Sequence, residues 1–371
     1  MEENCNVTNC PGIYNCAGLV AFWEALNKRK SLEPWQDEKG VINLWNNIDL
    51  KGLNIPYSND FNGVFDGNCH VLSGVKLEGQ AYCALFGRLG VSGVVKNLEV
   101  IGSINTTGSY SGLVGINKGL IQNCSFRGDH NGPGYLGGIA GFNEESGRII
   151  ECKYTGNISN GTGYCSGITG LNRGAIIACQ VNCAIQSSGY TGLITGLNEG
   201  TISGCTCSGI VFCAECYCGG ITGYNRGDIL GCDCSCKIFG QSDESKTNFD
   251  IGGIAGINGG NIKCCTFTGQ IDCVEHGGIV GINRKSVDSC VCEKLITSID
   301  NACGGGIVGR NSDEGVVINC HNELYISKSK NSGRVAYNNQ RVLTNCSWRG
   351  SENEKGVIQG EDSTLRLDIR L

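Results

Sequence analysis

The chain has 371 residues and a formal net charge of −6, with 59 glycines, 26 cysteines and only 4 prolines. The glycines follow no three-residue period, which excludes collagen, and the shortage of proline argues against a disordered chain. Without a basic run or a stretch of 18 apolar residues, the sequence predicts neither nucleic-acid binding nor membrane insertion.

The N-terminal region contains one amphipathic helix. Residues 17–30 place Leu19, Phe22, Trp23 and Leu26 on one face at helical spacing. A repeat array must cover its terminal coils, because exposed strand edges invite association. We therefore expect residues 1–40 to form a cap, with this helix as its lid.

A six-residue motif repeats through residues 105–350. It first reads Gly112-Leu-Val-Gly-Ile-Asn117, and its copies end at asparagines spaced 25 to 33 residues apart. Self-similarity with a nearly constant period is typical of a solenoid, in which insertions loop out of single coils. Stacked turn asparagines can satisfy the backbone and one another's amides. The copies end at Asn117, Asn143, Asn172, Asn198, Asn225, Asn258, Asn283 and Asn311, and a degraded one ends at Asn338.

Between the motifs, apolar and polar residues alternate with period two. Examples are Cys124-Ser-Phe126 and Cys152-Lys-Tyr154, in which the middle residue points outward. Such alternation predicts short strands. The sequence therefore predicts an all-β fold, a parallel β-helix of the right-handed β-solenoid type. It should have about ten coils of about 27 residues, three short strands per coil and an N-terminal helical cap.

The repeated motif resembles a known family. The string from Gly112 to Cys124 is similar to the GLUG motif of bacterial surface proteins, and Phe61–Asn68 and Leu85–Gly87 resemble the coils that precede GLUG repeats. The resemblance implies opening coils over 41–104 and GLUG-like coils over 105–350. Family members are mostly solenoid segments of adhesin-like surface proteins, some beside immunoglobulin A-cleaving metallopeptidase domains. The resemblance thus implies an extracellular or cell-surface location. Residues 1–6 lack the charged-then-apolar order of a secretory signal, which leaves a cytoplasmic location as the alternative.

The C-terminal residues 351–371 alternate again. Gly356–Gly360 and Thr364–Leu371 both have the pattern of strands. We expect them to form capping strands.

Nine cysteines form one column, one per coil. Free cysteine is among the most buried residue types, so a ladder of buried thiols is the favoured interpretation. Neighbouring coils are ~4.8 Å apart, within disulfide range, but in-register Cβ vectors point alike and would strain most bridges. The column consists of Cys124, Cys152, Cys179, Cys205, Cys232, Cys265, Cys290, Cys320 and Cys346.

A denser group of cysteines lies between residues 205 and 236. Cys213 and Cys216 have the spacing of metal ligands, and Cys218 adds a third thiolate. A zinc or iron–sulfur site needs four converging ligands, so we predict no cofactor. A metal-binding or redox protein using this group is an alternative function, and a local disulfide is a further alternative.

Catalytic signatures are sparse. The four histidines form no HExxH motif. The carboxylate pairs Asp272 with Glu275 and Asp313 with Glu314 are expected in turns. In the outward column after the cysteines, Asp233 and Asp288 are expected beside Lys153, which makes no carboxylate stripe. We therefore predict no enzyme; a polysaccharide-active β-helix is the enzymatic alternative.

A column of tyrosines recurs just before the glycine motifs: Tyr110, Tyr135, Tyr164, Tyr190 and Tyr217. It is consistent with packing at a corner or with a sugar-stacking stripe. We predict a non-enzymatic structural or binding solenoid, adhesin-like, with a protein or glycan partner. The further alternative is an end-to-end assembling filament or scaffold subunit.

Overall fold

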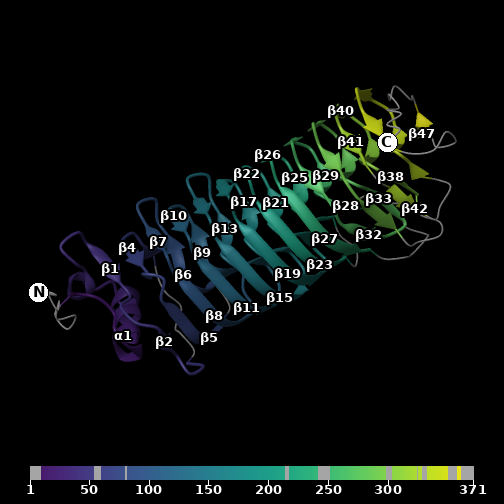
Figure 1. Cartoon of the computed structure of the whole chain (residues 1–371). Helices are drawn as coiled ribbons and strands as arrows, with labels where there is room; N and C mark the ends of the chain where they lie inside the picture. The colour runs from purple at the N-terminus through teal and green to yellow at the C-terminus, as the bar shows by residue number, and fades with distance from the viewer. Residues whose placement is uncertain are drawn as a thin grey trace, which may run out of the picture.

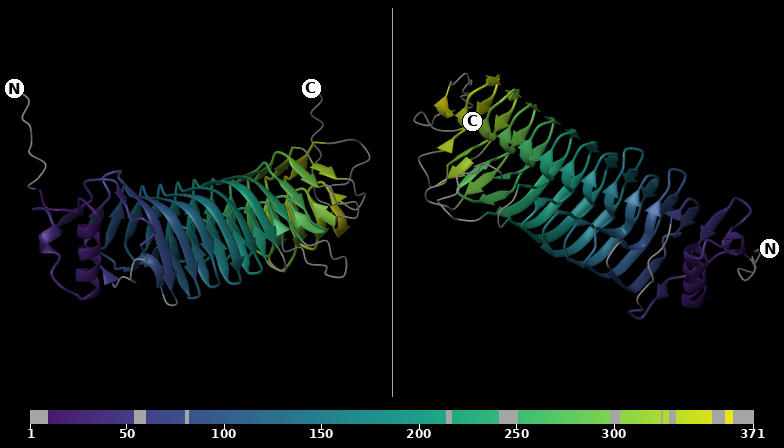
Figure 2. Two further views of the ribbon diagram at one scale, coloured as in Figure 1. Left: turned by 90° about the horizontal axis from the view of Figure 1, so that it is seen from below. Right: turned by 180° about the vertical axis from the view of Figure 1, so that it is seen from behind.

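The computed structural model describes residues 10–53, 60–79, 82–213, 217–240, 251–297, 303–323, 325–327, 332–349 and 357–360. These residues form an elongated stack of coils, with a helix across its N-terminal end (Figure 1, Figure 2). Successive coils contribute parallel strands to three long faces. The predicted parallel β-solenoid is confirmed.

Helix α1 (Cys16–Asn27) covers the N-terminal end of the stack. Asn15 caps it by accepting a hydrogen bond from the Gly18 N–H at 2.9 Å. The predicted apolar face is buried, and the Phe22 ring packs against Phe61 and Phe65 of the first coils at 6.3 and 5.9 Å between centroids. The helix therefore closes the apolar interior, as a lid should.

The helix is shorter than the predicted 17–30. It ends at Asn27 because Arg29 adopts a left-handed φ of 50°, and the Lys30 N–H turns back to the Ala25 carbonyl at 2.9 Å. A 3₁₀ turn, η2 (Glu33–Trp35), follows. Of the helices that the structure describes, none has the length and apolar character needed to cross a bilayer.

Sheet 1 has 12 strands, each three residues long. The middle residue of each strand points inward and is 0–1% exposed, from Ile42 to Leu343. Each such aliphatic side chain contributes about 1.5–3 kcal/mol on burial. The strands are β1 (Val41–Asn43), β4 (Val64–Asp66), β7 (Val94–Lys96), β10 (Leu120–Gln122), β14 (Arg148–Ile150), β18 (Ala175–Ile177), β22 (Thr201–Ser203), β26 (Asp228–Leu230), β30 (Asn261–Lys263), β35 (Ser286–Asp288), β40 (Val316–Ile318) and β45 (Val342–Thr344).

Sheet 2 has 15 strands and is the widest face through the middle of the stack. Its main strands are β2 (Ile48–Asp49), β5 (Val71–Gly79), β8 (Glu99–Thr106), β11 (Ser125–Asn131), β15 (Lys153–Gly161), β19 (Gln180–Ser187), β23 (Thr206–Cys213), β27 (Asp233–Phe239), β31 (Thr266–Phe267), β36 (Val291–Cys292), β41 (His321–Asn322) and β46 (Ser347–Trp348). Toward the C-terminus, the far half of this face is formed by β32 (Gln270–Asp272), β37 (Leu295–Thr297) and β42 (Tyr325–Ser327).

Sheet 3 begins with β3 (Asp60–Phe61), β6 (Tyr82–Leu89) and β9 (Tyr110–Asn117), and each later coil divides its strand in two. The division falls within the glycine motif, so most coils have four or five strands rather than three. The pairs are β12 (Tyr135–Gly137) with β13 (Ala140–Asn143), β16 (Tyr164–Ser166) with β17 (Thr169–Asn172), β20 (Tyr190–Gly192) with β21 (Thr195–Asn198), β24 (Cys218–Gly219) with β25 (Thr222–Asn225), β28 (Ile251–Gly252) with β29 (Ala255–Asn258), β33 (Glu275–Gly277) with β34 (Val280–Asn283), β38 (Cys303–Gly305) with β39 (Val308–Asn311), and β43 (Ser332–Gly333) with β44 (Ala336–Asn339).

The C-terminal strand β47 (Val357–Gly360) pairs in parallel with β44. It falls within the predicted capping strands of 351–371. The second of these, Thr364–Leu371, lies outside the described residues.

The asparagines of the motif form one buried ladder, which we call the asparagine ladder. Each amide nitrogen donates to the amide oxygen of the next asparagine at 2.7–3.0 Å. All its members are 0–1% exposed. The last one is Asn339 and not the predicted Asn338, because Asn311 pairs in register with Asn339. The degraded final copy has lost both glycines, and this displaced the sequence alignment by one residue.

An asparagine inside the ladder should matter more than one at its end. Asn198→Ala leaves the Asn172 amide nitrogen and the Asn225 amide oxygen without their ladder partners, at about 1–3 kcal/mol for each buried group. Asn117→Ala, at the first rung, removes one ladder bond, to the Asn143 amide oxygen, and the 3.1 Å hydrogen bond that the Gly119 N–H donates to Asn117. Thermal unfolding followed by circular dichroism should show the larger loss for Asn198→Ala; an equal or smaller loss would contradict the ladder.

Candidate functional site

The nine predicted cysteines follow the corner between sheet 1 and sheet 2. The residue before each of them has a left-handed φ of 50–59°. Asparagine and glycine tolerate this conformation best, and they occupy five of the nine corners, including Asn123 and Gly204. Because the chain turns there, the cysteine that follows points into the interior. All nine are free thiols and 0–1% exposed.

Each of these thiols has a hydrogen-bond acceptor from its own corner. The sulfur lies 3.2–3.5 Å from the carbonyl oxygen two residues earlier in every coil. Burial raises the pKa of the Cys152 and Cys179 thiols well above the ordinary value. Both of these thiols therefore stay protonated, and because all nine column sulfurs are buried, the column exposes no nucleophile.

The described cysteines between 205 and 236 belong to three different environments. Cys205 and Cys232 are members of the column. Cys207, Cys234 and Cys236 also point inward, with 3.4 Å between the Cys234 and Cys236 sulfurs. The third environment is a sheet corner that holds a disulfide.

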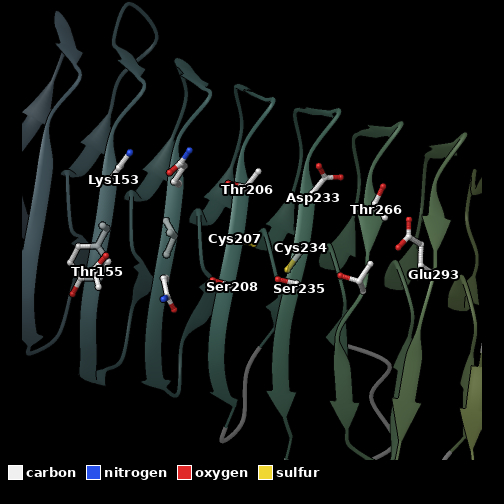
Figure 3. A pocket seen from close by; sticks show the side chains of 15 residues that line it. Lys153, Thr155, Thr206, Cys207, Ser208, Asp233, Cys234, Ser235, Thr266 and Glu293 are labelled. Atoms are coloured by element: carbon white, nitrogen blue, oxygen red, sulfur yellow. The ribbon is translucent and has the colours of Figure 1, made fainter.

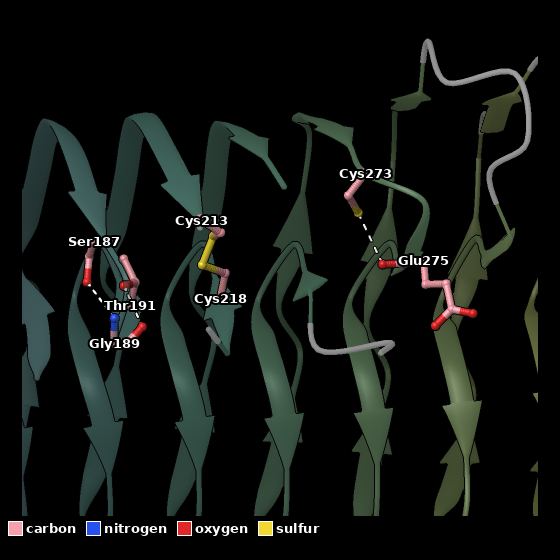
Figure 4. Close-up of a disulfide and its surroundings, with 7 residues drawn as sticks. All are labelled: Ser187, Gly189, Thr191, Cys213, Cys218, Cys273 and Glu275. Atoms are coloured by element: carbon pink, nitrogen blue, oxygen red, sulfur yellow. Dashed lines mark hydrogen bonds between the residues drawn. A yellow bond between two sulfur atoms is a disulfide. The ribbon is translucent and has the colours of Figure 1, made fainter. Parts of the chain in front are cut away.

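The disulfide joins Cys213 to Cys218 across the turn from sheet 2 to sheet 3 (Figure 4). In the preceding coil, Ser187 and Thr191 occupy the same register positions. That turn is closed by hydrogen bonds of both side chains to Gly189, each 3.0 Å long. The disulfide is thus a covalent version of a turn that the fold also closes without sulfur.

This disulfide joins two of the three cysteines that were predicted as candidate metal ligands. Cys213 and Cys218 have no thiolate to donate while it is formed, and Cys216 lies outside the described residues. Over the part of the chain that the structure describes, no group of three His, Cys, Asp or Glu side chains could hold a metal ion.

The predicted tyrosines form a continuous stack on the outside of sheet 3, which begins one coil earlier at Tyr82. Neighbouring ring centroids are 4.9–5.6 Å apart from Tyr82 to Tyr217. Beside the stack, the outward Ile257 and Ile282 are only 3% and 9% exposed, packed with Tyr217 and Tyr224. Since each inner ring has a tyrosine on both faces, the stack presents ring edges to a sugar. The geometry favours corner packing over a sugar-stacking stripe.

A polar groove of about 520 Å³ lies on the outer face of sheet 2, and we call it the sheet 2 groove (Figure 3). Strand alternation turns Tyr154, Val181 and Cys207 inward, so their neighbours on both sides face outward as two rows. One row is Lys153, Gln180, Thr206, Asp233 and Thr266. The other is Thr155, Asn182, Ser208, Ser235, Thr268 and Glu293.

A second hollow of about 340 Å³ extends the sheet 2 groove toward the N-terminus. It shares Lys153 and Thr155 with the groove and reaches Glu99 and Arg127, which form an ion pair of 3.0 Å. One predicted neighbour is absent from these rows: Asp288 lies on β35 in sheet 1, because it precedes Cys290 by two residues rather than following it. Val291 takes that place in the outward row.

Two histidines are buried inside the solenoid. His130, 1% exposed, stands on β11 where the next coil has Ile158, and its Nδ1 lies 3.2 Å from the Tyr154 hydroxyl. Its Nε2 has no hydrogen-bond partner. Burial lowers the pKa of His130 to about 3 and that of His276 to about 4. Both imidazoles are therefore neutral structural groups.

A polar cluster at the end of sheet 2 escaped the sequence analysis. The His321 Nδ1 lies 2.7 Å from the Ser347 hydroxyl, and its Nε2 is 3.7 Å from Glu323. Arg349 pairs with the same carboxylate at 3.2 Å, which offsets its charge. Only the register of successive coils joins His321 and Glu323 to Ser347 and Arg349, which follow 26 residues later.

The predicted carboxylate pairs differ from each other. Asp313 is in a turn as expected, paired with Arg284 at 3.4 Å. Asp272 and Glu275 are not both in a turn: Asp272 ends β32 and Glu275 begins β33, where its side chain is 9% exposed. Strand pairing with the neighbouring coils extends to both residues and overrides the turn-like local sequence.

The comparisons with known proteins add little. No family model and no curated protein matches the chain. Among solved structures, it is similar to the crystal structure of a candidate immunoglobulin A1 protease from Bacteroides ovatus. The identity is 19%, the match covers 94% of this chain and 83% of that one, and the TM-score is 0.38. A likeness of this size carries no argument about function.

The contrast between two adjacent cysteines tests the buried column. Cys264 is exposed at the left-handed corner, and Cys265 behind it is 0% exposed. A brief alkylation of the native protein, read by peptide mass spectrometry, should modify Cys264 and leave Cys265 unmodified. After unfolding in denaturant both should react. Equal native labelling of the two would show that the column is open to solvent.

Stability should fall with acid because of His130. Its folded pKa is about 3, below the ordinary 6.5, so the unfolded state binds a proton that the folded state does not. This contribution to stability is complete above pH 6.5 and is lost progressively as pH falls from about 6.5 to 3. His130→Phe should flatten the fall in urea midpoint over that range. Parallel curves for the two proteins would contradict the assignment.

Proposed function

We propose that the chain is a non-enzymatic binding solenoid of the cell-surface type, which holds an extended glycan along the sheet 2 groove. The observation that carries the proposal is the pair of polar rows across successive strands. They offer hydroxyl and amide groups at the spacing of the coils, ~4.8 Å, which is comparable with one pyranose residue in an extended chain. A polyhydroxylated polymer can therefore meet a similar set of partners in coil after coil.

A glycan suits this groove better than a peptide strand. Peptides that add to a sheet use the free backbone groups of an edge strand. On the face of sheet 2, the backbone groups of strands such as β23 and β27 are engaged with neighbouring coils. What remains for a ligand is side-chain chemistry, mainly neutral donors and acceptors such as Asn182, Ser208 and Thr268.

The cell-surface part of the proposal is supported by the resemblance of the repeated motif to GLUG repeats. End-to-end assembly is not part of it, because α1 covers the apolar interior at the N-terminal end. The cysteines contribute to the scaffold, since the column is buried away from the groove surface.

Filling the groove should abolish binding. Ser208 lies in the middle of one row, and Ser208→Trp places an indole across the path of the ligand. The matched control is Ser203→Trp, at a half-buried outward position of β22 on sheet 1. On an array of neutral, amine-bearing and acidic glycans, Ser208→Trp should lose at least tenfold in signal and Ser203→Trp should keep it. The proposal fails if the unmodified chain binds no glycan, or if both variants bind equally at unchanged melting temperature.

A further inference from the structure

Three charged side chains line the sheet 2 groove. In the described residues, Lys153, Asp233 and Glu293 are exposed and have no ion-pair partner. Three ion pairs flank the groove: Glu99 with Arg127 at 3.0 Å, Lys263 with Asp288 at 3.2 Å and Glu323 with Arg349 at 3.2 Å. Outside the groove lining, Lys237 on β27 and Lys294 beside Glu293 are also exposed without an ion-pair partner among the described residues. Within the lining, three charges are left to face a ligand.

These three charges are ordered along the solenoid. Lys153 is at the N-terminal end of the groove, Asp233 is three strands further and Glu293 is two more (Figure 3). At ~4.8 Å per strand, Asp233 and Glu293 lie ~14 and ~24 Å from Lys153 along the axis. Neutral residues such as Gln180, Asn182, Thr206 and Ser208 fill the stretch between Lys153 and Asp233.

We infer that the groove selects an amine-bearing glycan, extended along the solenoid axis, whose ammonium groups lie against Asp233 and Glu293. This inference rests on the proposed function and names its ligand class. An acidic glycan in the same place would face two carboxylates, and repulsion would weaken its binding. Lys153 repels ammonium groups at the other end and so directs the amines to the C-terminal half of the groove.

Three oligosaccharides of equal length separate charge from shape. Glucosamine oligomers carry amines, N-acetylglucosamine oligomers have the same backbone without charge, and galacturonic acid oligomers carry carboxylates. By isothermal titration calorimetry, the glucosamine oligomer should bind most tightly and the acidic oligomer most weakly. Salt should weaken the binding of the glucosamine oligomer, since its extra affinity comes from exposed charge pairs.

Variants that remove one charge at a time show whether that side chain attracts or repels the ammonium groups of the ligand. Asp233→Asn and Glu293→Gln should each weaken glucosamine binding about three- to fivefold, as expected for exposed ion pairs. Lys153→Met should tighten it, because it removes a repulsion. Glu38→Gln removes the same charge from an exposed position of the cap and should change nothing.

The outcomes distinguish the two proposals. If the acetylated or the acidic oligomer binds as well as or better than the glucosamine oligomer, and Ser208→Trp abolishes that binding, the charge inference is overturned and the proposed function stands. If Lys153→Met weakens glucosamine binding, the assigned polarity is overturned. If none of the three oligomers binds, both proposals fall.

Discussion

The parallel, in-register pairing of successive coils is the constraint on which the rest of this structure depends. Each residue lies beside its equivalent one coil away, so any residue type that recurs in the sequence becomes a column in space. The asparagine ladder shows the strength of this constraint. Its amides can satisfy each other only if the register holds through every coil, including the one with the longest insertion, between Asn225 and Asn258.

The same constraint accounts for the recurrence of cysteine at one position of the coil without assigning these residues a catalytic role. The corner between sheets 1 and 2 needs a left-handed residue followed by a small inward side chain. A thiol fits there, is largely apolar, and has the carbonyl two residues earlier within reach. Ile176 and Ile202 fill the interior three residues earlier, in the middle of the sheet 1 strands. The column cysteines are therefore the same structural position repeated in successive coils, rather than a set of metal ligands.

Much of the architecture could be predicted from the sequence because it depends on repetition. The motif from Gly112 to Asn117, the period-two strands and the apolar face of the cap helix are local patterns, and the structure has them where they were expected. Errors of register occur at the degraded copy that ends at Asn339 and at Asp288, which was assigned to the outward row of the wrong strand. The disulfide depends on how a turn closes, which spacing alone does not give.

The sheet 2 groove could not be found in this way. Its members, such as Lys153, Asp233 and Glu293, are separated by tens of residues, and only the folded register places them on one surface. The most direct test of its role is a crystal structure of the chain with a bound glucosamine oligomer. We expect the oligomer to lie along the axis across β19, β23, β27, β31 and β36, with amines beside Asp233 and Glu293. An oligomer bound against the tyrosine stack of sheet 3, or at the cap, would contradict the assignment of the groove.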